Sequence, residues 1–142
     1  MSAPKKTTAT VIPGMRYRDA PAAIEWLCQA FGFAKRLVVP GEGGTIAHAQ
    51  LTFGNGMIML GSAGAHGGGY DELVKTPREL GGIGSQAAYV IVEDPKAHYD
   101  RAVAAGAEVL LPLQAQDYGG SGYTCRDPEG HVWSFGDHNP WL

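Results

Sequence analysis

The chain has 142 residues, of which 44% are hydrophobic and 18% charged, and its net charge is −3. This size and composition are those of one globular domain with its own core. No basic run extends beyond Lys5-Lys6 and no apolar run reaches membrane-span length, so we expect no nucleic-acid and no membrane partner. Cys28 and Cys125 are isolated and the N-terminus lacks a signal-peptide core, so we expect a cytoplasmic protein without disulfides.

The first half of the chain predicts a strand, a helix and three more strands, in that order. Asp19 can cap the N-terminus of the helix, and Gly32 follows its last residue, Phe31. The Asn55-Gly56 pair between two apolar runs is a strong hairpin signal. The expected strands cover residues 10–17, 34–39, 46–53 and 57–62, and the helix covers residues 19–31.

The strand over 46–53 alternates cleanly between apolar and polar residues. Ala47, Ala49, Leu51 and Phe53 share one face, which we expect to meet the helix. The other face carries polar side chains and is expected to face solvent or a cavity. These side chains are His48, Gln50 and Thr52.

The second half predicts the same order of elements. Strands are expected over 86–92, 109–113, 123–126 and 131–135, with a helix over 94–105 that ends at Gly106. A glycine-rich connection, residues 63–84, joins the halves and contains a possible short helix within 70–80. A connection of this length is either a mobile flap or a hinge.

A constant offset of 74 residues supports an internal repeat. It separates the glycines that end the two helices, Gly32 and Gly106, and the turn glycines Gly56 and Gly130. We therefore predict a single domain, residues 1–142, that contains two units of about residues 10–62 and 84–136.

The repeat closes on Arg-Asp-Pro-Glu-Gly-His-Val-Trp-Ser-Phe, residues 126–135, which is a turn followed by a strand. Two tandem βαβββ units with this closing motif resemble the vicinal oxygen chelate superfamily, which includes glyoxalase I, extradiol dioxygenases and bleomycin-resistance proteins. The PhnB-like and bleomycin-resistance-like branch is the most similar. The resemblance implies an α+β fold with a curled mixed sheet, a concave ligand cup, and a homodimer, sometimes with units swapped between chains.

Enzymes of this superfamily hold a divalent metal through four positions, at the start of the first strand and the middle of the last strand of each unit. With the 74-residue offset, the resemblance assigns these positions to Ile12, Leu60, Gln86 and Ser134. Divalent ions require several oxygen or nitrogen donors, and this set offers few. We therefore expect no metal, no other cofactor, and neither glyoxalase I nor dioxygenase chemistry.

The same resemblance places polar and apolar side chains together in the cup, a mixture that suits a small organic ligand. Two aromatic residues outside the expected elements, Tyr118 and Trp141, are further candidates, although loop aromatics equally often pack locally or at a dimer contact. Trp133 and Phe135 are assigned to the core. The expected ligand-binding residues are Ile12, His48, Gln50, Leu60, Gln86, Tyr118, Thr124, Ser134 and Trp141.

Three functions follow from these expectations. The first is a metal-independent protein that binds an aromatic or amphipathic, drug-like small molecule. The second is an enzyme of the same superfamily, of lyase, isomerase or hydrolase type, that uses His48 as an acid–base residue or an unusual set of metal ligands. The third is a structural or regulatory protein in which the cup is vestigial.

Overall fold

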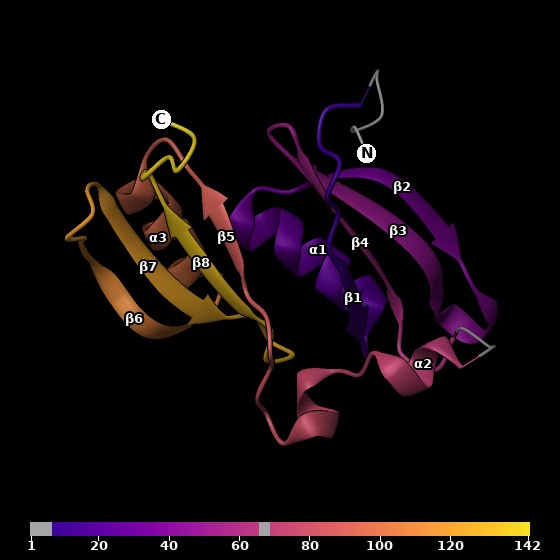
Figure 1. The fold of residues 1–142 in the computed structure, drawn as a ribbon. Helices are drawn as coiled ribbons and strands as arrows, with labels where there is room; N and C mark the ends of the chain where they lie inside the picture. Colours follow the sequence, from indigo (N-terminus) through magenta and orange to yellow (C-terminus); the bar gives the residue numbers. More distant parts are fainter. Residues whose placement is uncertain (1–6, 66–68) are drawn as a thin grey trace. The chain divides into compact units, whose positions relative to one another are not determined.

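The computed structural model describes residues 7–65 and 69–142 and has the α+β fold expected from the sequence (Figure 1). Two four-stranded mixed sheets are each associated with a helix of 10 or 12 residues. The chain divides into two compact units, residues 1–76 and 77–142. Each unit is described separately.

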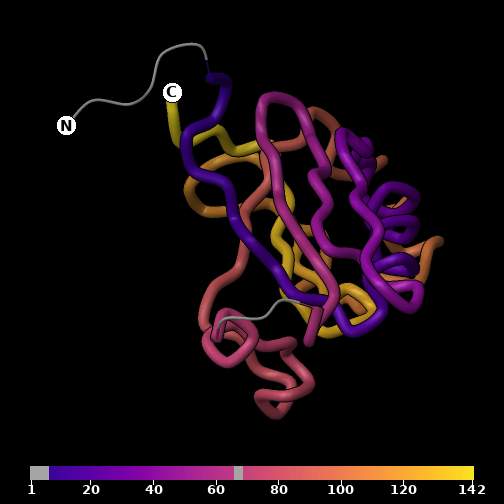
Figure 2. The backbone as a smooth tube through the Cα atoms, turned by 90° about the vertical axis from the view of Figure 1, so that its right-hand side faces the viewer, coloured from indigo at the N-terminus to yellow at the C-terminus, as the bar shows by residue number. Residues whose placement is uncertain are grey.

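The sheet of the first unit has the strand order β1-β4-β3-β2. β1 pairs with β4 in parallel, and the other pairs are antiparallel. The long strands β3 and β4 run side by side and are joined by the expected Asn-Gly hairpin (Figures 1 and 2). The strands are β1 (Gly14–Tyr17), β2 (Ala34–Pro40), β3 (Ile46–Phe53) and β4 (Gly56–Ser62).

The helix of this unit, α1 (Ala20–Phe31), begins and ends where the sequence predicts. The Asp19 carboxylate accepts a hydrogen bond from the Ala22 amide, which would otherwise have no partner within the helix. Gly32 follows with a φ of 87°, a left-handed conformation that glycine adopts without strain.

One face of the first sheet packs against α1, which contacts all four strands. Leu27 and Phe31 of the helix are fully buried there, as are Ala49 and Leu51 of β3. The apolar half of the alternating pattern therefore forms the core, as expected. We call the opposite side of this sheet the open face.

The second unit repeats this arrangement, with strand order β5-β8-β7-β6 and helix α3 (Pro95–Ala104). Asp94 caps α3 as Asp19 caps α1, by accepting a hydrogen bond from the Ala97 amide. Trp133 and Phe135 are buried core residues, as predicted. The strands are β5 (Ala88–Ile91), β6 (Glu108–Ala115), β7 (Ser121–Arg126) and β8 (Val132–Gly136).

The spacing between equivalent residues is not constant along the units. Gln50 and Thr124 are equivalent and lie 74 residues apart, but their partners in the following strands, Met59 and Ser134, lie 75 residues apart. The hairpin between β7 and β8 is therefore one residue longer than that between β3 and β4. The single offset used in the sequence analysis fails beyond this turn, which corrects the assignment of Leu60 below.

The connection between the repeats contains two short helical segments, α2 (Tyr70–Leu73) and a 3-10 turn at Pro77–Leu80. α2 lies in the first unit and the turn in the second. Both contact strands or hairpins of their own unit, through Arg16 and Arg78 respectively.

Candidate functional site

The open face of the first sheet combines apolar and polar side chains in register. Because paired residues of neighbouring strands point to the same side of a sheet, one row across this face is set by the observed pairs. It contains Gly14, Met59, Gln50 and Leu37. The polar half of the β3 pattern therefore faces away from the core, as the alternation predicted.

His48 and Gln50 contact one another on this face, with 3.1 Å between His48 Nε2 and Gln50 Nε2. Both residues are partly buried, so their polar groups are accessible to a ligand. The contact orients the imidazole through a neutral amide. The pair is suited to hydrogen bonding with a ligand.

Arg16 lies on the same face, one end of which is bordered by α2. Only 6% of Arg16 is exposed. Its Nε lies 3.4 Å from Asp71 Oδ1, and its guanidinium carbon lies 4.5 Å from the centre of the Tyr70 ring. Arg16 pairs with Gly61, whose missing side chain leaves backbone as the floor beside the arginine. The cation is held by an ion pair and a cation–π contact.

A cavity of about 500 Å³ lies at the opposite, hairpin end of the open face. Its walls come from the chain before β1, from β2 and from the β3–β4 hairpin. Thr52 and Met57, which are partners in the sheet, contribute the part that belongs to the open face. The volume is in the range of pockets that hold small molecules. The lining residues are 7–9, Ile12, Arg36, Thr52 and 54–57.

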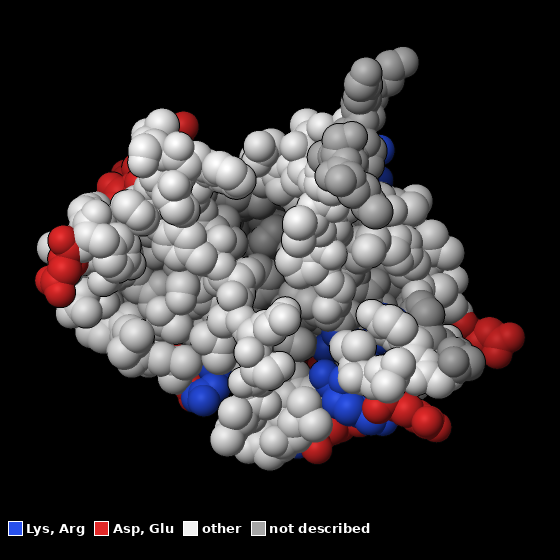
Figure 3. Space-filling view, viewed as in Figure 1, with Lys and Arg blue, Asp and Glu red and all other residues white. Residues whose placement is uncertain are grey.

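Charged side chains are unevenly distributed over the surface in Figure 3. In this view most of the surface is uncharged, while lysines, arginines and acidic residues gather along the lower rim and at the two sides. Both signs of charge occur along the rim, so it does not form a single-sign patch.

The outward face of the second sheet carries a smaller polar cluster. Thr124 and Ser134 are cross-strand partners, and their hydroxyl oxygens lie 2.7 Å apart. Beside Ser134, the Tyr89 hydroxyl donates a hydrogen bond to the His138 carbonyl at 2.7 Å. Partial burial, together with the nearby Tyr118 and Asp137, raises the pKa of Tyr89. The phenol therefore stays protonated at neutral pH and can act as a donor.

Several residues expected in one cup occupy different places. Leu60 pairs with Ala49, is only 2% exposed and belongs to the helix-facing core, so its assignment to the ligand face is wrong. Met59 holds the position on the open face. Ile12 precedes β1 but lines the cavity, and Gln86 is an exposed residue that precedes β5.

The two aromatic candidates outside the strands are both exposed. The Tyr118 ring packs edge-on against His138, with 4.8 Å between the ring centres, and so belongs to the cluster around Tyr89. Trp141 is 90% exposed. Neither contributes to the core.

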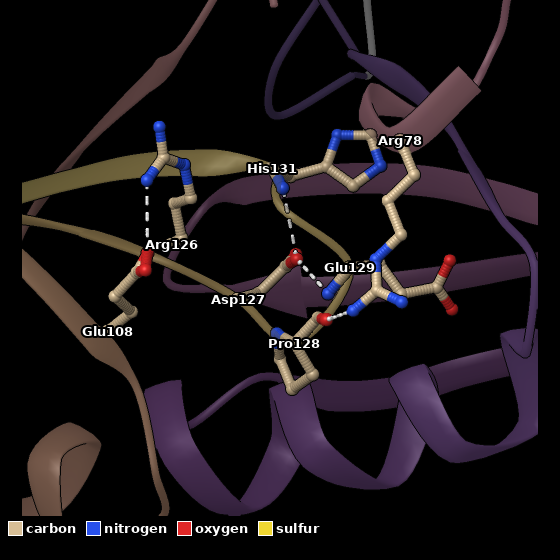
Figure 4. A network of polar contacts seen from close by, with 7 residues as sticks. All are labelled: Arg78, Glu108, Arg126, Asp127, Pro128, Glu129 and His131. Carbon is tan, nitrogen blue, oxygen red and sulfur yellow. Dashed lines mark hydrogen bonds and ion pairs between the residues drawn. The ribbon is translucent and has the colours of Figure 1, made fainter. Parts of the chain in front are cut away.

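The motif that carried the resemblance forms a rigid turn (Figure 4). Asp127 is 4% exposed, and its Oδ1 accepts hydrogen bonds from the amides of Glu129 and His131. Its Oδ2 accepts one from Trp133 Nε1 at 3.1 Å. The Arg78 guanidinium donates to the Pro128 carbonyl and ties the 3-10 turn to this hairpin. These residues determine the shape of the hairpin rather than a binding surface.

The metal positions of the superfamily do not fit a divalent ion in this chain. The paired positions in the first and last strands are Gly14 with Met59, and Tyr89 with Ser134. None offers a carboxylate or an imidazole, the donors that hold such ions best. Within residues 7–65 and 69–142, no three His, Cys, Asp or Glu side chains gather as a metal site would require.

Sequence reasoning missed three of the residues that shape the open face. Arg16 follows Gly14 by two positions, so strand alternation could have placed it beside the polar residues of β3. Arg36 is the extra residue of a bulge, because Lys35 and Leu37 pair with the consecutive residues Leu51 and Gln50. Tyr70 reaches the sheet through the connection, and no local pattern predicts such a contact.

None of the helices in the described parts of the chain is long and apolar enough to cross a bilayer. The fold and the two faces can now be compared with known proteins.

The family model "Glyoxalase/Bleomycin resistance protein/Dioxygenase superfamily" matches residues 9–135. An uncharacterised protein of Mycobacterium bovis is 33% identical over 124 residues, which cover 87% of this chain and 80% of that protein. An uncharacterised protein of Mycobacterium tuberculosis (strain H37Rv) has the same identity over the same length, covering 71% of that protein.

Solved structures agree with this match. TioX from Micromonospora sp. ML1 is 32% identical, with a TM-score of 0.70, and the alignment covers 91% of this chain and 98% of TioX. The fosfomycin resistance protein FosX from Mesorhizobium loti, at 10% identity and a TM-score of 0.64, shares the fold over 94% of each chain. The chain therefore belongs to the glyoxalase/bleomycin resistance protein/dioxygenase superfamily.

Proposed function

We propose that this protein binds an aromatic or amphipathic small molecule without a metal ion, and that the open face of the first sheet is the binding surface. The observation that carries the proposal is the open face itself. It places the His48–Gln50 pair beside apolar Met59 and Leu37, and it ends in a cavity of about 500 Å³. Apolar walls with a few fixed polar groups are typical of small-molecule sites.

The choice of a metal-independent site is supported by the available donors. On the open face His48 is the one strong metal ligand among the strand residues described, and its neighbour Gln50 is a weak neutral donor. Asp71 lies beside Arg16, whose positive charge opposes the arrival of a second cation.

The first test measures metal content and ligand binding in the same sample. Protein purified without an affinity tag is analysed by mass spectrometry for metals, before and after incubation with zinc, nickel, manganese and iron(II). Planar aromatic compounds are then screened by isothermal titration calorimetry with and without EDTA. We expect well below one ion per chain and affinities that EDTA does not change. About one tightly held ion per chain would overturn the metal-independent proposal.

Variants locate the binding surface. Gln50→Ala and His48→Ala should each weaken binding of a hit from the screen by about fivefold to tenfold, since each removes one hydrogen bond worth roughly 1 kcal/mol. Gln29→Ala, at an exposed position of α1, is the matched control and should leave the affinity unchanged. Conversion of a carbonyl or epoxide compound that His48→Ala abolishes would instead favour an enzyme with His48 as its acid–base residue.

A further inference from the structure

The cavity at the hairpin end of the open face has a distinctive charge. Arg36 is the one charged side chain among the described residues that line it. The other polar groups are the hydroxyls of Thr7, Thr8 and Thr52 and the amide of Asn55. Hydroxyl, amide and guanidinium groups all donate hydrogen bonds, and the described lining contains no carboxylate that would neutralise the arginine.

The backbone explains why Arg36 belongs to the cavity. It is the extra residue of a β-bulge, and a bulge redirects the side chain that it carries. The preceding Lys35 forms an ion pair with Glu25 of α1, which satisfies both charges away from the cavity. Arg36 instead lines the cavity with Thr52, so the two neighbouring cations serve opposite sides of β2.

The cavity also has an apolar side. Ile12 and Met57 line it, and Met59 continues the apolar surface along β4 towards Gln50. A molecule that reaches from the cavity onto the open face would therefore meet a cation and hydroxyls at one end and methionines along its length.

We infer that the cavity binds the oxyanion group of an amphipathic small molecule, with Arg36 as the charged partner, while the apolar body of the molecule lies on the open face. This inference rests on the proposed function and specifies its ligand class. A guanidinium matches the geometry of carboxylate, sulfonate and phosphate oxygens, and its hydrogen bonds to them are among the strongest in proteins.

The test uses two fluorescent probes with the same ring system. 8-Anilinonaphthalene-1-sulfonate carries an anionic group, and N-phenyl-1-naphthylamine lacks it. We expect the full chain to bind the sulfonate more tightly than the neutral amine. Arg36→Gln should weaken sulfonate binding by about tenfold or more, the effect of losing a charge-assisted hydrogen bond, and leave binding of the amine unchanged.

Lys35→Gln is the matched control, because it removes the same charge from the adjacent position on the other side of the strand. It should leave both affinities unchanged. Equal effects of the two substitutions would show general electrostatic attraction and overturn the assignment of Arg36. Circular dichroism checks that both variants keep the fold, as expected for exposed side chains.

The remaining outcomes separate the two proposals. If neither probe binds the unmodified chain, the proposed function and the inference both fail. If both probes bind but Arg36→Gln affects neither, small-molecule binding stands and the oxyanion site is refuted. Competition with 1-naphthoate and 1-naphthyl phosphate then identifies the group: displacement by either supports the inference and names the oxyanion, and displacement by neither overturns it.

Discussion

Asp127 is buried at the turn between β7 and β8, where both of its carboxylate oxygens accept hydrogen bonds. Asp127→Asn replaces one acceptor oxygen with a donor. The side chain can then accept from the two turn amides or from Trp133 Nε1, but not from all three. We expect a loss of about 2 kcal/mol in the free energy of unfolding, measured by urea denaturation, because hydrogen bonds to charged groups contribute roughly this much.

Asp117→Asn is the control for this substitution, because Asp117 is an exposed aspartate in a loop of the same unit. It should change the free energy of unfolding by less than about 0.5 kcal/mol. An equal effect of the two substitutions would show that overall charge, rather than the Asp127 hydrogen bonds, controls stability.

The two cysteines differ in their access to solvent. Cys125 is fully buried, and this burial, with a smaller contribution from Asp127, raises the pKa of its thiol to about 12. Burial also raises the pKa of Cys28, which is only partly covered. With Ellman's reagent at pH 8 we expect one accessible thiol, Cys28, and a second only after unfolding, because a raised pKa depletes the reactive thiolate.

Cys28→Ser should remove the accessible thiol, and Cys125→Ser should retain it; the reverse pattern would contradict the burial of Cys125. The sign of the pH dependence follows. An unfolded thiol ionises near about 8.5, so unfolding releases a proton above that value. The Cys125 contribution to stability is therefore complete below that pH and is lost as the pH rises towards 12.

At the scale of elements, each principal helix begins with the same device. Asp19 and Asp94 each accept a hydrogen bond from an amide in the first turn of α1 and α3. We expect Asp19→Ala and Asp94→Ala each to lower the melting free energy by about 1 kcal/mol, the usual contribution of a capping side chain. Thermal unfolding followed by circular dichroism measures both.

Asp100→Ala provides a control within α3. Asp100 pairs with Lys96 one turn earlier on the exposed surface, and such pairs contribute only about 0.3–0.5 kcal/mol. A cost equal to that of Asp94→Ala would mean that charge on the helix matters more than the cap.

Local signals of this kind allowed the elements to be predicted from the sequence. The capping aspartates, Gly32 and the strict alternation of β3 determine structure over a few residues, and the structure agrees with them. The register between strands is different. A hairpin longer by one residue moves every following side chain to the other face, and Leu60 was therefore assigned to the wrong side.

Contacts distant in sequence set the remaining limit. The polar residues of β3 could be predicted as a surface, but the cation–π contact between Arg16 and Tyr70 depends on how the connection returns to β1. The cavity likewise combines residues before β1 with the β3–β4 hairpin. Such contacts require the tertiary fold, which no short pattern encodes.

At the scale of the whole molecule, the two sheets end in edge strands with different protection. β6 contains Pro112, which lacks a backbone donor and so discourages pairing with another chain. β2 has no proline before its last residue, and all seven of its residues are exposed, including Leu37, Val38 and Val39. A second copy of the chain is the partner that we expect at β2, because closed symmetric dimers are the commonest assemblies.

We therefore predict a homodimer that contacts through β2. Light scattering on a sizing column should give about twice the chain mass of 15.0 kDa. Val38→Lys should shift the protein to the monomer, because a charge would be buried in the contact without a partner. Leu111→Lys, on the exposed edge strand β6, is the matched control and should leave the dimer intact. Dissociation by Leu111→Lys alone would place the contact at β6 and refute the assignment to β2.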